Sequence, residues 1–128
     1  MLNKTGITKT SGIAPVQILF NVQNQMSVGV KVSSAMSSTT VNGRKIVKAG
    51  TPVTGDLTNR AVAFTAAGTD NAVGVLLHDV DITDGDANAS LLIWGFVNLD
   101  RMDTATQGLI TSGVKTSLAG KVWFLKDN

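Results

Sequence analysis

The longest apolar stretch of the chain, residues 89–99, carries apolar side chains at both parities of a β-strand. A strand with one face in water alternates apolar and polar residues, so this pattern predicts a strand covered on both faces. The two predicted faces carry Leu91, Ile93 and Val97 on one side and Leu92, Trp94 and Phe96 on the other. We expect the first face to form a core layer with Val75 and Leu77, and the strand to lie at the centre of the core.

A second apolar run, residues 73–82, precedes this strand and changes its alternation midway. Its apolar residues keep one parity up to Leu77 and take the other from Val80 onward. One extra residue in a strand turns every later side chain to the opposite face, so the change predicts a bulge or bend at His78-Asp79. The turn residues 83–86 would join the two runs as a long hairpin.

The remaining apolar patterns also favour strands. Residues 26–32 alternate as in a half-buried strand, and residues 121–126 read as a final strand that is apolar on both sides. Asn42-Gly43 predicts a type I′ hairpin turn that pairs residues 39–41 with 44–48, because both residues tolerate a positive φ. The fold class is therefore mainly β, as a small barrel-like domain.

One short helix is expected in the C-terminal half of the chain. Thr104 and Gln107 fit a capping box, with Thr104 as the N-cap. The apolar residues that follow keep helical spacing and Gly120 would close the helix, although internal glycines weaken it. We expect two to three turns.

The 128 residues divide into an arm, residues 1–15, and a single β-rich domain, residues 16–128. The arm is rich in Thr, Ser, Gly and Lys and has little to bury, so alone in solution it should be poorly ordered. Residues 1–50 hold six basic residues and no acidic one, whereas residues 51–128 hold five basic and nine acidic residues. This asymmetry either steers the basic part toward an acidic partner or reflects the difference between an arm and a globular body.

Composition narrows the possible chemistry. The chain has no cysteine, which excludes disulfides, thiolate catalysis and cysteine metal sites. Residues 13–20 are apolar but are interrupted by Pro15 and Gln17, and they are too short to cross a bilayer; we expect no signal peptide and no membrane partner.

The acidic residues between 79 and 86 are the only candidate cation site. The cluster consists of Asp79, Asp81, Asp84 and Asp86. Counted from Asp79, an EF-hand loop would need Gly at its sixth position and Glu at its twelfth, where this chain has Asp84 and Ser90. We therefore interpret these carboxylates as solvated edge and turn residues, and expect no bound metal.

No recognisable motif for catalysis accompanies the sole histidine, His78. Its neighbour Asp79 would point to the opposite face of a strand, which disfavours a hydrogen bond between the two side chains. The glycines match neither a phosphate loop nor a dinucleotide fingerprint. The lysines lack interleaved aromatic residues for stacking on bases, so direct nucleic-acid binding is not expected. We expect no catalytic residues and no cofactor.

Three segments in a fixed order carry a resemblance to a known family. They read K-A-G-T-P-V at 48–53, A-V-G-V-L-L-H-D-V-D at 72–81, and A-N-A-S-L-L-I-W-G-F-V-N at 87–98. This order resembles the head-decoration, or capsid-stabilising, proteins of tailed bacteriophages, the family that includes the lambda decoration protein. The resemblance covers about the last two-thirds of the chain.

The resemblance implies a β-tulip fold, a homotrimer, and a place on the outer surface of the expanded capsid at three-fold and quasi-three-fold positions. It implies that the protein is made in the bacterial cytoplasm and has the major capsid protein as its partner. It also implies that the N-terminal arm joins the sheet of that capsid protein.

Two predictions about contact residues follow from the side chains. Trp94 and Trp123 are expected at a trimer interface, because one domain of this size has little chain to cover both faces of its apolar strands; the alternative is that the helix from Thr104 covers them. The arm residues suited to an added strand are Lys4, Thr5, Ile7, Thr8, Lys9 and Thr10.

Two alternative functions remain open. A β-clip small-ligand-binding domain of the antifreeze-like type also uses an Ala-Gly corner such as Ala49-Gly50. The basic first half of the chain would suit a nucleic-acid-associated virion protein.

Overall fold

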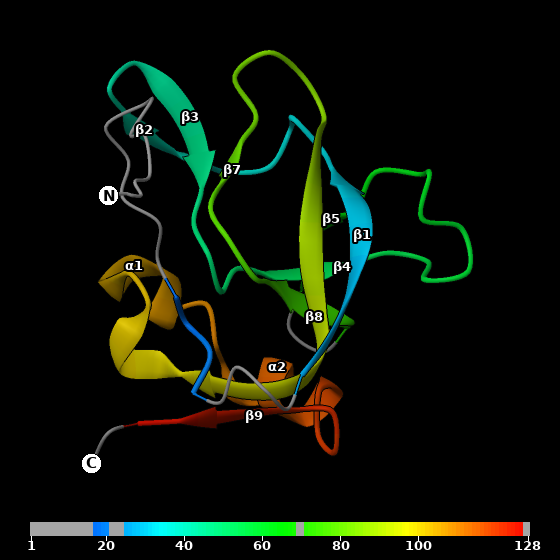
Figure 1. The fold of residues 1–128 in the computed structure, drawn as a ribbon, viewed down its shortest axis with the longest axis vertical. Helices are drawn as coiled ribbons and strands as arrows, with labels where there is room; N and C mark the ends of the chain where they lie inside the picture. The colour runs from blue at the N-terminus through cyan, green and yellow to red at the C-terminus, as the bar shows by residue number, and fades with distance from the viewer. Residues whose placement is uncertain (1–16, 21–24, 69–70, 127–128) are drawn as a thin grey trace, which may run out of the picture.

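Two β-sheets and two short α-helices make up the part of the chain that the computed structural model describes, residues 17–20, 25–68 and 71–126 (Figure 1). Strand accounts for 40% and helix for 12% of it, which confirms the mainly β class. The predicted arm, residues 1–15, lies outside the described residues.

The larger sheet is built around one long strand, β8. Its antiparallel order is β1 (Met26–Val32), β8 (Ala87–Asn98), β6 (Gly74–Leu76), β4 (Pro52–Thr54) and β5 (Thr65–Ala66). The last strand, β9 (Val122–Leu125), pairs in parallel with the end of β8. The three segments that carry the resemblance thus contribute the adjacent strands β4, β6 and β8.

A three-stranded sheet of β2 (Thr39–Val41), β3 (Arg44–Val47) and β7 (Val80–Asp81) lies at the other end of the molecule (Figure 1). The turn between β2 and β3 is the predicted one, since Asn42 and Gly43 have φ values of 52° and 78°. Those positive values suit a type I′ turn.

The predicted break at His78-Asp79 is confirmed, but the hairpin beyond it is not. Before the break, β6 pairs with β8 through Val75 and Leu76. After it, β7 leaves this sheet and pairs with β3. The turn at residues 83–86 therefore joins strands of two different sheets, because the change of parity is also a change of sheet.

A second irregularity, in β8 itself, overturns the predicted division of its faces. Ser27 of β1 lies opposite Leu92 while the adjacent Met26 lies opposite Trp94, so Ile93 is an extra residue on β8. Such a bulge reverses the facing of all later residues. Gly95, whose φ is 154°, follows at a conformation that side chains disfavour.

The core accordingly has two clusters, one on each face of the large sheet. Leu92 and Val97 share the first cluster with Val75 and Leu77, whereas Leu91 belongs to the second. Ile93 is half-buried against the second cluster. The expected single layer of Leu91, Ile93, Val97, Val75 and Leu77 is therefore wrong.

Two helices replace the single predicted one. A 3-10 turn (Leu99–Arg101) precedes α1 (Thr104–Gln107) and α2 (Ser112–Ser117). Asp103, not Thr104, is the N-cap of α1, and the Gln107 side-chain amide donates to the Met102 carbonyl, so the capping box is wrong. The helix does not continue because the Thr111 hydroxyl accepts from the Val114 amide and starts α2. Neither helix has the length or the apolar run that a bilayer crossing requires.

Candidate interaction surface

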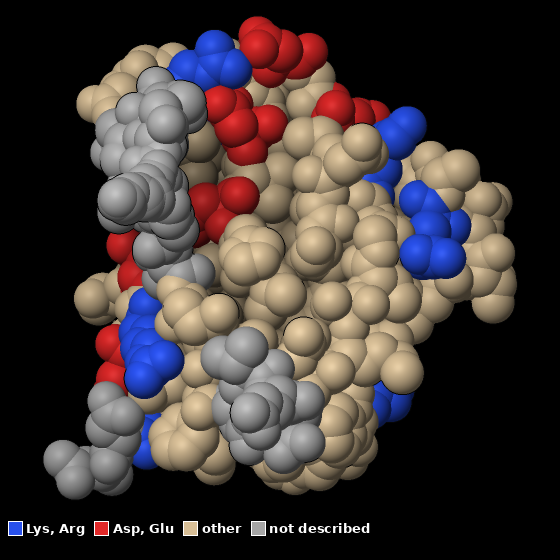
Figure 2. Space-filling view, in the orientation of Figure 1, with Lys and Arg blue, Asp and Glu red and all other residues tan. Residues whose placement is uncertain are grey.

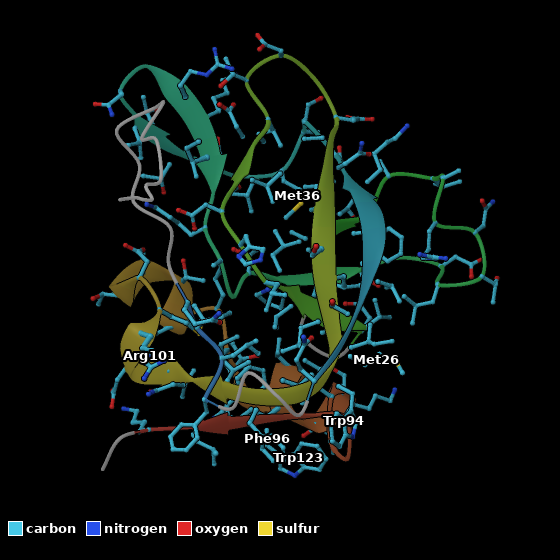
Figure 3. All side chains as sticks on the ribbon, viewed as in Figure 1. Met26, Met36, Trp94, Phe96, Arg101 and Trp123 are labelled. Carbon is cyan, nitrogen blue, oxygen red and sulfur yellow. The ribbon has the colours of Figure 1, made fainter. Side chains whose placement is uncertain are left out.

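Three aromatic rings come together where β8 pairs with β9. Trp94 and Phe96 are two residues apart on β8, so they share one face. The parallel register places Trp123 of β9 opposite Phe96. The Phe96 and Trp123 rings stack at 5.0 Å, while Trp94 meets Phe96 edge-on at 5.9 Å and Trp123 at 6.0 Å. The cluster closes the lower end of the molecule (Figure 3).

These rings remain open to solvent. Trp94 is 40% exposed and Trp123 is 38% exposed. Apolar neighbours extend the cluster: Met26 lies opposite Trp94, Leu125 follows Trp123 on the same face of β9, and the Phe20 amide donates to the Phe96 carbonyl. We call this set the aromatic patch: Phe20, Met26, Trp94, Phe96, Trp123 and Leu125.

The helices lie behind the patch and do not cover it. Val114 and Leu118 of the α2 segment pack into the first core cluster with Val122, the inward neighbour of Trp123. Consecutive strand residues face opposite sides, so α2 covers the inner face of β9 and leaves Trp123 outside. The alternative in which the helix covers the two tryptophans is therefore wrong.

Leaving large aromatic side chains exposed to water is unfavourable in free energy, and such side chains are enriched at the centres of protein interfaces. None of the six members of the aromatic patch is charged. The patch can therefore exclude water against another apolar surface, with its two tryptophans as the anchors.

The acidic residues form a region of a different kind at the opposite end, where basic and acidic side chains meet over β3 and β7 (Figure 2). Arg44 Nε lies 2.8 Å from Asp81 Oδ2, and Arg44 Nη2 lies 2.9 Å from Asp84 Oδ2. Hydrogen bonds from Arg44, then from Thr83, lower the pKa of Asp81 to about 2. These carboxylates hold the β7 turn to β3.

The other two acidic residues also have structural partners. Asp79 Oδ1 accepts from the Ala49 amide at 2.8 Å, and Asp86 Oδ1 accepts from the Ser34 amide at 2.8 Å. The hydrogen bond from Ser34 lowers the pKa of Asp86. Within the described residues, no group of three or more acidic or histidine side chains converges on a metal position.

His78 and Asp79 do not act as a pair. His78 is exposed, whereas Asp79 is half-buried, bonded to Ala49, and 4.0 Å from Lys48 Nζ. Asp79 thus secures the corner before β4.

The structure brings together the two tryptophans that the sequence singled out. The arm residues Lys4, Thr5, Ile7, Thr8, Lys9 and Thr10 lie outside the described residues. Four surface residues were not predicted from the sequence: Phe20, Met26, Phe96 and Leu125. Phe96 was missed because an unbroken alternation would place it on the same face as the buried Leu92. Gly95, directly between two aromatic residues, is the one local signal of an irregular strand.

No protein-family model matches this chain, and a search of curated proteins finds no significant match.

Proposed function

We propose that this protein is a head-decoration protein of a tailed bacteriophage. In this proposal it binds the outer surface of the expanded capsid as a homotrimer at three-fold and quasi-three-fold sites, and stabilises the shell against the pressure of the packaged DNA. Its role is structural, without catalysis or a cofactor, and its partners are the major capsid protein and its own copies.

The exposed aromatic patch is the observation that carries the proposal. A protein that works by association needs a water-excluding surface, and Trp94 and Trp123 supply one on the paired strands β8 and β9. We assign the patch to the contact between subunits.

The sequence resemblance supports the same proposal. The three segments that carry it form β4, β6 and β8, which are consecutive neighbours in the large sheet. The second segment also continues into β7, which pairs with β3 of the small sheet.

The arm would provide the grip on the capsid. An extended segment can add a strand to an exposed sheet edge through main-chain hydrogen bonds, and residues 4–10 suit such a strand. Ordering about ten residues costs roughly 1–2 kcal/mol each in backbone entropy, so attachment would combine the arm with body contacts and the avidity of three subunits.

Co-sedimentation with undecorated expanded heads tests the proposal. Full-length protein should pellet with the heads, whereas a variant lacking residues 1–15 should stay folded and oligomeric but bind weakly. Unexpanded heads are the control, because decoration requires the expanded lattice.

Two results would contradict the proposal. Failure of the full-length protein to bind expanded heads would refute decoration itself. Equal binding by the truncated protein would refute the arm mechanism alone. A native mass of one subunit, with affinity for small acids, would instead favour a β-clip ligand-binding domain.

A further inference from the structure

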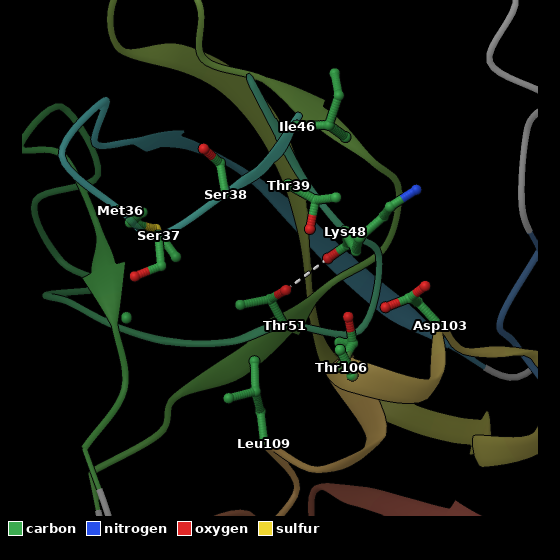
Figure 4. A pocket seen from close by; sticks show the side chains of 12 residues that line it. Met36, Ser37, Ser38, Thr39, Ile46, Lys48, Thr51, Asp103, Thr106 and Leu109 are labelled. Atoms are coloured by element: carbon green, nitrogen blue, oxygen red, sulfur yellow. Dashed lines mark hydrogen bonds between the residues drawn. The ribbon is translucent and has the colours of Figure 1, made fainter. Parts of the chain in front are cut away.

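An open groove of about 280 Å³ lies between the small sheet and α1 (Figure 4). Its lining includes the apolar side chains of Met36, Ile46 and Leu109, from three separate parts of the chain. Lys48 and Asp103 bring charged groups to the same lining. Leu109 is 48% exposed, so part of this apolar lining is in contact with water.

A free strand edge borders the groove. β2 pairs with β3 on one side, and no strand among residues 17–20, 25–68 and 71–126 pairs with its other side. Thr39, which lines the groove, is the first residue of β2. An uncovered edge presents backbone amides and carbonyls that an extended segment can bind.

Followed backward from Phe20, the described chain leads toward this groove. Leu19 pairs antiparallel with Val97, and the Asn98 amide donates to the Ile18 carbonyl at 2.8 Å. Followed backward from Phe20 to Ile18, the chain therefore runs alongside β8 toward its end. β8 continues from there into the 3-10 turn and α1, the wall of the groove (Figure 1). Arg101 fixes this entry point by donating to the Leu19 carbonyl.

The arm has the reach and the chemistry for this groove. An extended chain spans about 3.3 Å per residue, so the segment before Gln17 is long enough to cross α1. Thr5, Ile7 and Thr8 are strand-forming residues, and Ile7 offers an apolar side chain for the lining. Asp103 is exposed and forms no ion pair within the described part of the chain, which leaves its charge available to Lys4 or Lys9.

We propose that, in the free protein, residues 4–10 dock in this groove of their own chain. They add a strand to the open edge of β2 and place Ile7 against Leu109. A short tether gives the arm an effective concentration in the millimolar range, which favours the same chain over a second copy. The body then supplies the order that the arm lacks alone. This inference concerns the free protein, so it does not depend on capsid binding.

Paramagnetic relaxation measured by NMR tests the docking directly. The chain has no cysteine, so Ser11→Cys creates a single position for a spin label next to the docking segment. The sample contains chains that carry both ¹⁵N and the spin label, diluted into protein that carries neither. In this sample the amide signals of Thr39, Thr40 and Leu109 should be lost, and they should return when the spin label is reduced. A mixture of ¹⁵N chains without a label and spin-labelled ¹⁴N chains should show no loss at these positions.

A matched pair of variants in the labelled chain isolates the groove. Leu109→Asp should restore the signals of Thr39 and Thr40, because it puts a charge where Ile7 docks. Val62→Asp changes an even more exposed side chain, 60% against 48%, in a loop outside the groove, and should leave the loss unchanged. Asp103→Lys repels the arm without changing the apolar lining and should also restore the signals.

Three outcomes would overturn the proposal. The first is that the groove signals are retained in the labelled chain. The second is that they are lost only in the mixed sample, which would assign the groove to the arm of a neighbouring chain, and the third is that Leu109→Asp and Val62→Asp have equal effects.

Discussion

The middle of β8 and the outer face of its last part differ in how completely the chain covers them. At the middle of the strand, Leu91 and Leu92 face opposite sides and both are fully buried, because each face of the sheet has its own core cluster. In the last half, one face packs on the first cluster through Val97 and the other presents Trp94 and Phe96 to solvent. Both parts carry large apolar side chains in sequence.

The polar residues repeat this contrast. Beside the start of β8, Asp81, Asp84 and Asp86 bond to Arg44 and to the Ser34 amide within the same chain. At its far end, the rings of the aromatic patch contact one another and water. The polar side chains beside one end of the strand thus have partners within the subunit, whereas the aromatic side chains at the other end are open to solvent.

Truncation of core residues in the covered half should have the largest effect on stability. Leu92→Ala removes a fully buried side chain and should lower the free energy of unfolding by about 2–5 kcal/mol. Ile93→Ala should cost less, since the bulge leaves Ile93 only half-buried. Urea denaturation of both variants measures the difference in the free energy of unfolding, with Trp94→Ala as a comparison at an exposed position of the same strand. Equal losses at positions 92 and 93 would contradict the half-burial of Ile93 at the bulge.

The sequence was informative wherever a local rule decided the structure. The type I′ turn at Asn42-Gly43 and the parity change at His78-Asp79 depend on residues that are adjacent in the chain, and both were predicted. The final strand is also where its apolar run placed it, with β9 at Val122–Leu125.

The rest depended on tertiary pairing, which the one-dimensional pattern does not contain. The bulge at Ile93 is defined by the register of β1 against β8, and β1 is about sixty residues away in sequence. The two faces of β8 were therefore misassigned, and the contact between the Trp94 and Trp123 rings, which depends on the pairing of β8 with β9, was not predicted. The split of the helix has a local cause instead: the Thr111 hydroxyl accepts from the Val114 amide and caps a new helix, and Thr111 was not recognised as an N-cap.

A charge in the aromatic patch should change association and leave the fold intact. Trp94→Lys places an ammonium group on the patch, which would have to be desolvated in a contact between subunits. Native mass spectrometry and analytical ultracentrifugation should show the proposed trimer reduced to folded monomers. Val62→Lys, at a side chain that is 60% exposed and outside the patch, should stay trimeric. A trimeric Trp94→Lys protein would contradict the assignment of Trp94 to the contact between subunits, and an unfolded one would show that Trp94 serves the fold of the subunit.

The smallest effect on stability is expected at the contact between β3 and β7, and this effect should depend on pH. Hydrogen bonds from Arg44 and Thr83 lower the pKa of Asp81 from 3.8 to about 2, so the folded state favours the ionised carboxylate. Its stabilising contribution is then fully present above pH 3.8 and is lost as the pH falls toward 2. Asp81→Asn should lower the melting temperature slightly at neutral pH, because the ion pair is exposed, and this difference should shrink on acidification. Arg44→Met, which removes the principal donor, should reduce the pH dependence in the same way. Parallel melting curves of the variants and the original protein across this acid range would show that the β3–β7 contact contributes nothing measurable to the subunit.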